Sequence, residues 1–133
     1  MSTSRQALGR WGEARAAEYL IARGYAIVER NVRTPYGEID LVARREPTRT
    51  AYPGKPAPTT VFVEVKTRSS KAFGFPEESV TPRKQAHLLA AAQSYIQEHP
   101  EFDGDWRIDV IAIQRDPSKA QPTITHFENA VNS

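Results

Sequence analysis

Hydrophobic and polar positions along the chain predict seven elements of secondary structure. Residues 4–23 carry small and apolar residues at helical spacing, and Gly24 follows where a helix end is expected. A second helix is predicted from Pro82 to just before Pro100, with Thr81 as its N-cap. Strand patterns cover residues 25–33, 38–44, 61–68, 106–113 and 123–130. The predicted order is therefore helix, three strands, helix and two strands (αβββαββ).

This order of elements indicates an α/β fold with a mixed sheet flanked by helices. The first three strands are close enough in sequence to form an antiparallel meander, with residues 34–37 as a hairpin turn. The helix between the third and fourth strands permits a right-handed parallel crossover. Residues 45–60 hold four of the ten prolines and are expected to form a flexible, exposed loop. A chain of 133 residues is the size of one domain, so residues 1–133 are expected to form a single domain.

Composition excludes several kinds of site. The chain has no cysteine, which rules out disulfides, thiolate zinc sites and cysteine nucleophiles. It shows no apolar membrane span and no secretory signal, so a cytoplasmic location is expected. Residues 1–97 hold 15 Lys or Arg against 9 Asp or Glu, whereas residues 98–133 hold 3 against 7. The basic first part could attract phosphate backbones, but surplus arginines are equally an ordinary solubilising surface.

Two of the predicted strands carry charges that a core strand would lack. Alternation along residues 61–68 places Glu64, Lys66 and Arg68 on one face. Asp40 lies within the strand 38–44, although Asp is among the residues that strands least favour. If the two strands are neighbours, Asp40 and Glu64 come within reach of a single ion. The alternative is a solvent-facing strand whose Glu and Lys form weak cross-strand ion pairs.

The same alternation assigns one face of the strand 38–44 to Ile39, Leu41 and Ala43, and the opposite face to Asp40. Two carboxylates that share a face repel each other unless one is protonated or a cation lies between them. Mg²⁺ is typically held by one or two carboxylates, with its other positions left for water and phosphate. Such a site suits phosphodiester hydrolysis, with Lys66 close to the charge that grows on the phosphate. Glu13, on the small-residue face of the first helix, could add a third carboxylate.

A family resemblance extends over nearly the whole chain. It rests on the segments "GRWGEARAAEYLIARGYAIVERNVR", "GEIDLVA", "VFVEVKTR", "FGFPEESVTPRK" and "RIDVIAI", in this order. Together they resemble the YraN family of uncharacterised bacterial proteins, which is grouped with the PD-(D/E)XK nuclease superfamily and is similar to archaeal Holliday-junction resolvases. The resemblance implies a restriction-endonuclease-like fold.

The resemblance also implies roles for four residues. Asp40 matches the first acidic residue of the superfamily signature, Glu64 and Lys66 match its (D/E)-x-K part, and Glu13 matches the helix-one glutamate of resolvase-like members. The expected function is Mg²⁺- or Mn²⁺-dependent cleavage of DNA, including branched or structured DNA, with Asp40, Glu64 and Glu13 as metal ligands. Resolvases act as dimers, so a homodimer is expected by analogy. The alternative is a nucleic-acid-binding or adaptor protein that keeps the fold without catalysis.

Other positions are candidates for contact with nucleic acid. Arg68 and Lys84 could reach a phosphate, Lys84 from the start of the second helix, although it is equally well explained as a surface lysine. Arg107 and Asp109 share a strand face and are expected to form a structural ion pair near the site. Aromatic residues near loops are expected to anchor those loops, with two exceptions considered as base-stacking candidates: Phe73 and Phe75. The three histidines show no metal-ligand spacing, and no site role is expected for them.

Overall fold

The computed structural model describes residues 4–46, 58–69, 80–102 and 104–132. Its elements are α1 (Ser4–Ala22), β1 (Tyr25–Thr34), β2 (Gly37–Arg45), β3 (Thr59–Arg68), α2 (Pro82–Glu98), β4 (Trp106–Gln114) and β5 (Thr123–Val131). The predicted order of elements is confirmed. The ends of the predicted loop 45–60 belong to β2 and β3, and its residues 47–57 lie outside the described residues.

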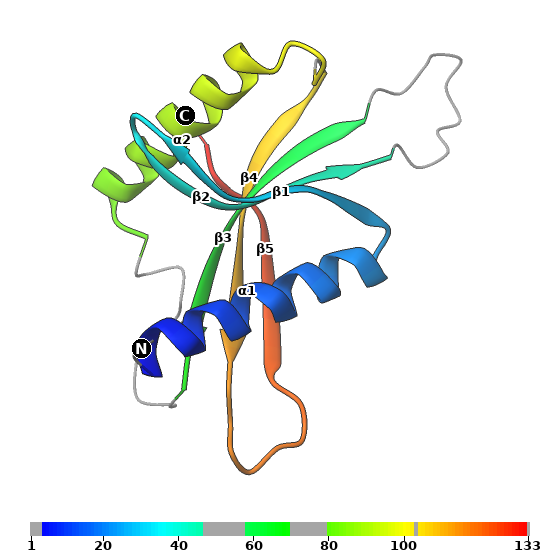
Figure 1. The fold of residues 1–133 in the computed structure, drawn as a ribbon, viewed down its shortest axis with the longest axis vertical. Coiled ribbons are helices and arrows are strands. Elements are labelled where there is room, and N and C mark those ends of the chain that lie inside the picture. Colours follow the sequence, from blue (N-terminus) through cyan, green and yellow to red (C-terminus); the bar gives the residue numbers. More distant parts are fainter. Residues whose placement is uncertain (1–3, 47–57, 70–79, 103, 133) are drawn as a thin grey trace.

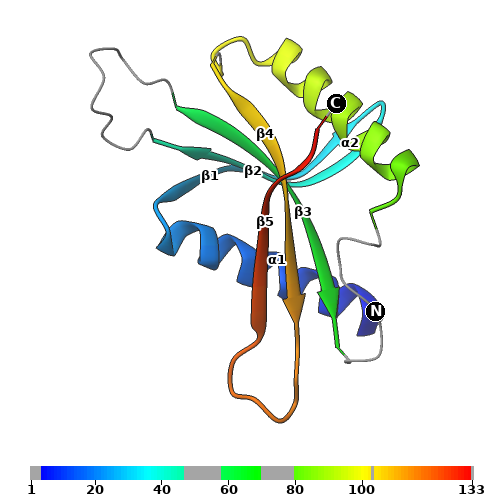
Figure 2. The same ribbon diagram turned by 180° about the vertical axis from the view of Figure 1, so that it is seen from behind.

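The five strands form one mixed sheet in the order β1-β2-β3-β4-β5. Strands β3 and β4 are parallel, while the three other neighbouring pairs are antiparallel. The parallel pair requires a crossover, and α2 supplies it. Helix α1 crosses in front of the sheet in Figure 1 and behind it in Figure 2, so the two helices cover opposite faces. The predicted α/β class, with a mixed sheet flanked by helices, is therefore confirmed.

Two apolar clusters pack the helices against the two faces of the sheet. The cluster under α1 consists of Ala16, Ala17, Leu20, Tyr25, Leu41, Ala43, Val61, Val63, Ile111 and Ile113. The cluster under α2 includes Val42, Phe62, Leu88, Ala91, Ala92, Tyr95, Ile108 and Val110. Consecutive residues of β3 alternate between these clusters, which fixes the register of the central strands. Neither helix in the described ranges has the length and apolarity needed to cross a membrane.

Helix α2 begins as its sequence predicts. The Thr81 side chain accepts a hydrogen bond from the backbone N–H of Lys84, and Pro82 occupies the first turn. This cap satisfies one of the free N–H groups of the helix start. It also fixes the position of Lys84, whose side chain points to the charged end of β3.

The alternation of side chains along strand β2 is interrupted at Asp40, so the predicted face of Ile39 is wrong. Ile39 lies in the cluster under α2, not on the face of Leu41 that alternation predicted. The pairing of β2 with β3 extends to Leu41, whereas its pairing with β1 continues to the hairpin turn. Opposite this point Asn31 has a left-handed backbone (φ 54°), which an L-residue other than Asn or Asp rarely adopts. This irregularity turns the β1–β2 hairpin away from β3 and toward α2.

Helix α1 approaches β3 unusually closely at Gly12. A Cβ atom built on Gly12 would overlap the Thr67 hydroxyl and would lie 2.9 Å from the Thr67 Cβ. Only glycine allows this approach. Gly9 lies one turn earlier on the same helix, and a Cβ atom built there would meet no atom within 4 Å. The close contact at Gly12 sets how near the next residue, Glu13, comes to the sheet.

Gly12→Ala is therefore expected to lower the free energy of unfolding by about 1–3 kcal/mol, because the methyl group must push α1 away from Thr67. Gly9→Ala is the matched control. It should leave the stability unchanged or raise it by about 0.5–1 kcal/mol, because alanine is the better helix former and the space is open. Urea unfolding of both variants measures the difference. Equal stability of the two variants would contradict the close contact.

Candidate functional site

The site lies where β2 leaves β3. Asp40 is at this branch point, and its Oδ2 atom accepts a hydrogen bond of 2.8 Å from the backbone N–H of Val65. Glu64, the preceding residue of β3, is buried with 7% of its surface exposed. The Asp40 carboxylate thus serves as the acceptor that a backbone carbonyl of β2 would provide if the β2–β3 pairing continued. Two carboxylates from neighbouring strands are thereby placed next to each other.

Burial and repulsion act together on this pair of carboxylates. Burial, followed by the charge of Glu64, raises the pKa of Asp40 to about 7, against the opposing hydrogen bond from Val65. The charge of Glu13 raises this pKa further, and that of Lys84 lowers it. The ionised form of Asp40 is therefore poorly stabilised by the protein itself, and a positive charge next to it would be favourable.

Two lysines approach the same oxygen of Glu64. The Nζ atom of Lys84 lies 2.7 Å from Glu64 Oε1, and the Nζ atom of Lys66 lies 3.5 Å from it. Burial and the neighbouring Lys84 lower the pKa of Lys66. Burial acts in the same direction on Lys84, but its hydrogen bonds with Glu64 and Lys66 and the charges of Glu64 and Asp40 together outweigh that effect and raise its pKa. Lys84 is therefore a member of the site and not a free surface lysine.

Glu13 faces the same region from α1. Burial raises its pKa, and the charges of Glu38 and Glu64 add to this effect, while a hydrogen bond with Asn31 opposes it. Asn31 is the residue with the left-handed backbone at the turnover of the β1–β2 hairpin. Asn31 was not among the residues predicted from the sequence, although an Asn within a strand pattern is itself a signal of positive φ. The same irregularity that bends the hairpin thus supplies a partner for Glu13.

Two clefts meet at the carboxylates. The larger, of about 520 Å³, runs between the first half of α1 and the end of β3, and its lining includes Arg5, Gly9, Glu13 and residues 64–69. The smaller, of about 350 Å³, lies between the hairpin turn and the start of α2, and is lined by Tyr36, Gly37, Glu38, Lys84, His87 and Leu88. Asp40 and Glu64 line both clefts. The charged pair is therefore open to a ligand from two sides.

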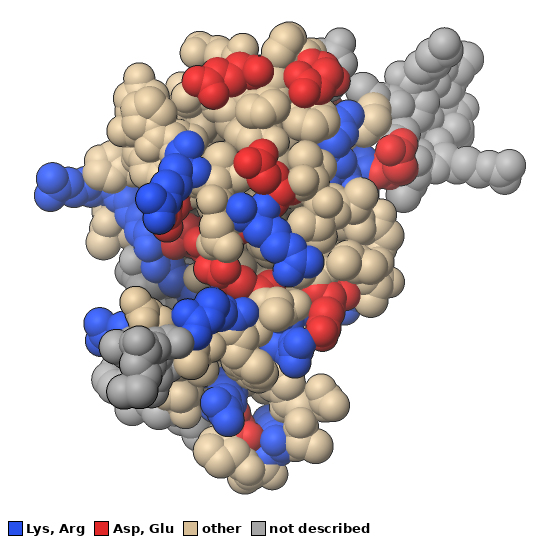
Figure 3. Space-filling view, viewed as in Figure 1, with Lys and Arg blue, Asp and Glu red and all other residues tan. Residues whose placement is uncertain are grey.

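Arg68 lines the larger cleft and has one side-chain donor without a partner among the described residues. Its Nε atom is buried, and no acceptor among the described residues bonds to it. Over the face in Figure 3, the described Lys and Arg side chains are spread among Asp and Glu instead of gathering in one basic area. On this face, positive charge therefore comes from individual side chains and not from one broad basic area.

Other predicted residues lie away from the site or outside the described residues. Arg107 and Asp109 form the expected ion pair, with Nε to Oδ1 at 3.0 Å, but they line neither cleft. Phe73 and Phe75 lie outside the described residues. Tyr36, which was expected to anchor its loop, is 53% exposed beside the smaller cleft. Hairpin position alone could not show that its ring lies in solvent.

The donor chemistry of the site fits a hard divalent cation. Asp40 and Glu64 provide carboxylate oxygens, which Mg²⁺ and Mn²⁺ prefer, and a cation would relieve the repulsion that raises the pKa of Asp40. Within the described ranges, no three His, Cys, Asp or Glu residues are close enough to hold one ion together. The site thus offers two carboxylates, the number at which Mg²⁺ keeps water and phosphate among its ligands. Glu13 stands outside this pair.

Asp40→Asn is expected to stabilise the fold by about 1–3 kcal/mol at pH 8, where the wild-type carboxylate is ionised. The amide removes a buried charge and the repulsion from Glu64, and its oxygen can still accept from Val65. Glu38→Gln on the same strand is the matched control. Its side chain is 59% exposed, so its stability should change by less than about 0.5 kcal/mol. Chemical unfolding in a metal-free buffer measures both, and a loss of stability in Asp40→Asn would contradict the repulsion.

Comparison with known sequences places these residues in a family context. The model of uncharacterised protein family UPF0102 matches residues 12–113. A UPF0102 protein of Dehalococcoides mccartyi is 41% identical over 131 residues, covering 98% of each chain. One of Syntrophomonas wolfei is 45% identical over 123 residues, covering 92% of this chain and 96% of its own. One of Geotalea uraniireducens is 46% identical over 126 residues, covering 94% and 89%. The matched range includes Glu13, Asp40, Glu64, Lys66 and Lys84.

Proposed function

Because the chain belongs to uncharacterised protein family UPF0102, whose description names no activity, we propose a function from its own site: metal-dependent hydrolysis of phosphodiester bonds in DNA. Membership confirms the resemblance to the YraN family. The further kinship with PD-(D/E)XK nucleases remains part of the proposal, and it is supported by Asp40, Glu64 and Lys66. The observation that carries the proposal is the buried Asp40–Glu64 pair with two lysines at one carboxylate oxygen.

Asp40 and Glu64 would hold a Mg²⁺ or Mn²⁺ ion, which would polarise the scissile phosphate and acidify the attacking water. The partly buried ammonium of Lys66 lies beside these carboxylates, where it stabilises negative charge that grows on the phosphate. Glu13, whose pKa is raised by burial, can hold a water molecule or take its proton within the larger cleft. These residues account for activation of the water and for the charge on the phosphate, and a second water in the open cleft would supply the proton of the leaving oxygen.

The cleft residues offer contacts for the DNA backbone. Arg68 and Arg5 both line the larger cleft and bring positive charge to it. Lys84 opens onto the smaller cleft at the start of α2, where the backbone N–H groups also favour anions. The ion pair of Lys84 with Glu64 would then loosen as phosphate and cation enter. Two clefts that meet at one pair of carboxylates suit a strand that passes through the site or a branched substrate.

The test is incubation of the purified chain with linear, nicked and four-way-junction DNA in Mg²⁺, in Mn²⁺ and in a chelator. We expect cleavage of at least one of these DNAs that requires the cation and is absent from Asp40→Asn. Cleavage that persists in the chelator or in Asp40→Asn would contradict the assigned site. Binding of DNA by both proteins, with no cleavage under any of these conditions, would instead support the nucleic-acid-binding alternative.

A further inference from the structure

A third polar pocket lies at the opposite end of α1 from the candidate site. Its volume is about 400 Å³, and it is lined by Tyr19, Ala22, Arg23, Tyr25, Arg45, His126 and Glu128. None of these residues lines either cleft of the candidate site. Arg23 follows Glu13 by ten positions at the end of the helix, a separation of roughly 15 Å at the helical rise. The pocket is therefore a separate feature, and the proposed nuclease chemistry does not use it.

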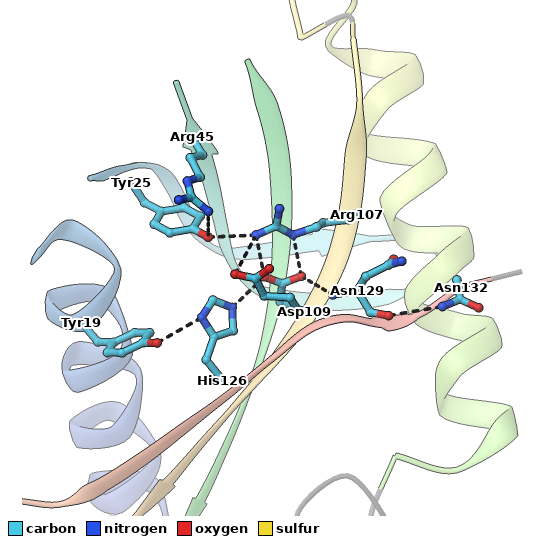
Figure 4. A network of polar contacts seen from close by, with 9 residues as sticks. Tyr19, Tyr25, Arg45, Arg107, Asp109, His126, Asn129 and Asn132 are labelled. Atoms are coloured by element: carbon cyan, nitrogen blue, oxygen red, sulfur yellow. Dashed lines mark hydrogen bonds and ion pairs between the residues drawn. The ribbon is translucent and has the colours of Figure 1, made fainter. Parts of the chain in front are cut away.

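A buried carboxylate holds His126, one of the residues that line this pocket, in a network of polar contacts (Figure 4). Asp109, fully buried, accepts hydrogen bonds from Arg107 Nε at 3.0 Å, from the backbone N–H of Asn129 at 2.8 Å and from His126 Nε2 at 2.7 Å. A carboxylate only accepts, so His126 Nε2 carries the proton and the neutral ring can accept at Nδ1 from the Tyr19 hydroxyl, 3.3 Å away. The pocket wall is thereby held together by contacts between separate elements of the fold.

Two arginines of the pocket are held over aromatic rings and not by carboxylates. The Arg23 guanidinium lies 4.3 Å from the centre of the Tyr19 ring, and that of Arg45 lies 5.3 Å from the centre of the Tyr25 ring. Arg45 also donates a long hydrogen bond of 3.4 Å to the Tyr25 hydroxyl. In the described part of the chain, neither arginine is within ion-pair distance of a carboxylate. Most of their planar N–H donors therefore remain available to a ligand.

We propose that this pocket binds a phosphate group, with Arg23 and Arg45 as its principal donors. Guanidinium groups bind phosphate oxygens through paired hydrogen bonds, and stacking on tyrosine rings restricts their orientation before the ligand arrives. The Tyr25 hydroxyl lies in the same lining, and because it accepts from Arg45 and Arg107 its own proton remains to donate a neutral hydrogen bond. The phosphate comes either from the backbone or end of a nucleic acid or from a small phosphorylated molecule.

The negative charge of Glu128 opposes phosphate binding, so its removal should change the phosphate affinity in the direction opposite to removal of an arginine. Its carboxylate also lines the pocket, is 56% exposed, and lies 3.8 Å from Arg107 Nη2. A negative side chain at the pocket opposes an anionic ligand, and Arg107 neutralises it only partly at this distance. Removal of this charge should therefore tighten phosphate binding, whereas removal of either arginine should weaken it.

In the experiment, the purified chain is titrated with inorganic phosphate in a metal-free buffer. The binding is monitored by NMR through the arginine Nε–H signals. We expect the signals of Arg23 and Arg45 to shift, and the double variant Arg23→Gln/Arg45→Gln to bind about tenfold or more weakly. Glu128→Gln should bind about two- to fivefold more tightly. Lys119→Gln, which removes an exposed charge in the β4–β5 connection, should bind as the wild type does. Asp40→Asn should also bind normally, which separates this pocket from the nuclease site.

The source of the phosphate is distinguished by two oligonucleotides of one sequence, with and without a 5′-phosphate. Equal shifts of Arg23 and Arg45 with both indicate backbone phosphate, shifts with only the phosphorylated one indicate an end, and shifts with neither indicate a small molecule. Single Arg23→Gln keeps the test valid if the double variant is unfolded, because Arg23 is exposed. Unshifted arginine signals in the wild type, or unchanged phosphate affinity in a folded Arg23→Gln, would overturn the proposal.

Discussion

Replacement of Lys66 by Met is expected to lower the rate of DNA cleavage by about 10²–10³-fold. The reason is the position of its side chain, which is 17% exposed and whose ammonium lies 3.5 Å from Glu64 Oε1 beside the proposed metal carboxylates. Water cannot substitute for a positive charge in such a place, and Met fills the same volume without it. Lys84→Met is expected to weaken DNA binding more than the rate, because Lys84 is more exposed, at 38%, and opens onto the smaller cleft.

Single-turnover cleavage, at DNA concentrations that span the dissociation constant, separates these two effects. The rate at saturation should fall in Lys66→Met, whereas the concentration for half-maximal rate should rise in Lys84→Met. Lys119→Met is the control, because it removes an exposed lysine in the connection between β4 and β5. A Lys66→Met protein that cleaves at saturation within a fewfold of the wild-type rate would remove Lys66 from the mechanism.

Asp109→Ala is expected to lower the free energy of unfolding by about 3–5 kcal/mol. The substitution leaves the Arg107 guanidinium, the His126 ring and the Asn129 backbone N–H without the acceptor that they share. Glu128→Ala removes a carboxylate near the same arginine, but one that is 56% exposed and 3.8 Å away. Its effect should stay below about 1 kcal/mol, because exposed ion pairs contribute little. Urea unfolding at neutral pH measures both variants.

The pH dependence of this difference provides a second measurement. Burial raises the pKa of Asp109, but the hydrogen bonds from His126, Arg107 and Asn129 and the charge of Arg107 together outweigh burial, so the pKa lies below its usual value. A lowered pKa in the folded state stabilises the protein above the pKa of the unfolded state, which is about 3.9 for Asp. This stabilisation is lost as the pH falls through the folded pKa. The gap between wild type and Asp109→Ala should therefore narrow below about pH 4, and a gap that widens there would contradict this assignment.

The fold follows from local patterns to an unusual degree. Helix and strand periodicities, the Thr81–Pro82 start of α2 and Gly24 after α1 place all seven elements close to their observed bounds. Strand alternation also predicts that Glu64 and Lys66 share a face, and the structure places the Lys66 ammonium 3.5 Å from Glu64 Oε1. These features depend on residues that are close in the sequence, and they can therefore be predicted from the sequence alone.

The features that the sequence could not reveal depend on contacts across the fold. Lys84 could equally have been a surface lysine until the orientation of α2 brought it within 2.7 Å of Glu64. Ile39 was assigned to the wrong face because strict alternation ignores the turnover at Asn31. The pocket at the end of α1 joins residues that lie far apart along the chain, and no short motif contains it. His126 carried no spacing signal, since its partner Asp109 lies on another strand.

The parallel pairing of β3 with β4 also has a consequence for the order in which the molecule assembles. Hairpins β1–β2 and β4–β5 join neighbours in sequence, whereas the β3–β4 ladder pairs Thr60 with Trp106 across the whole of α2. Non-local pairings of this kind form late, because closure of a long loop costs conformational entropy before any contact forms. Asp40 and Glu64 belong to the local meander and can meet early, while Lys84 arrives only when α2 docks. We therefore expect Lys66, which shares strand β3 with Glu64, to be the first cation beside the two carboxylates, and Lys84 to join it only after the crossover is complete.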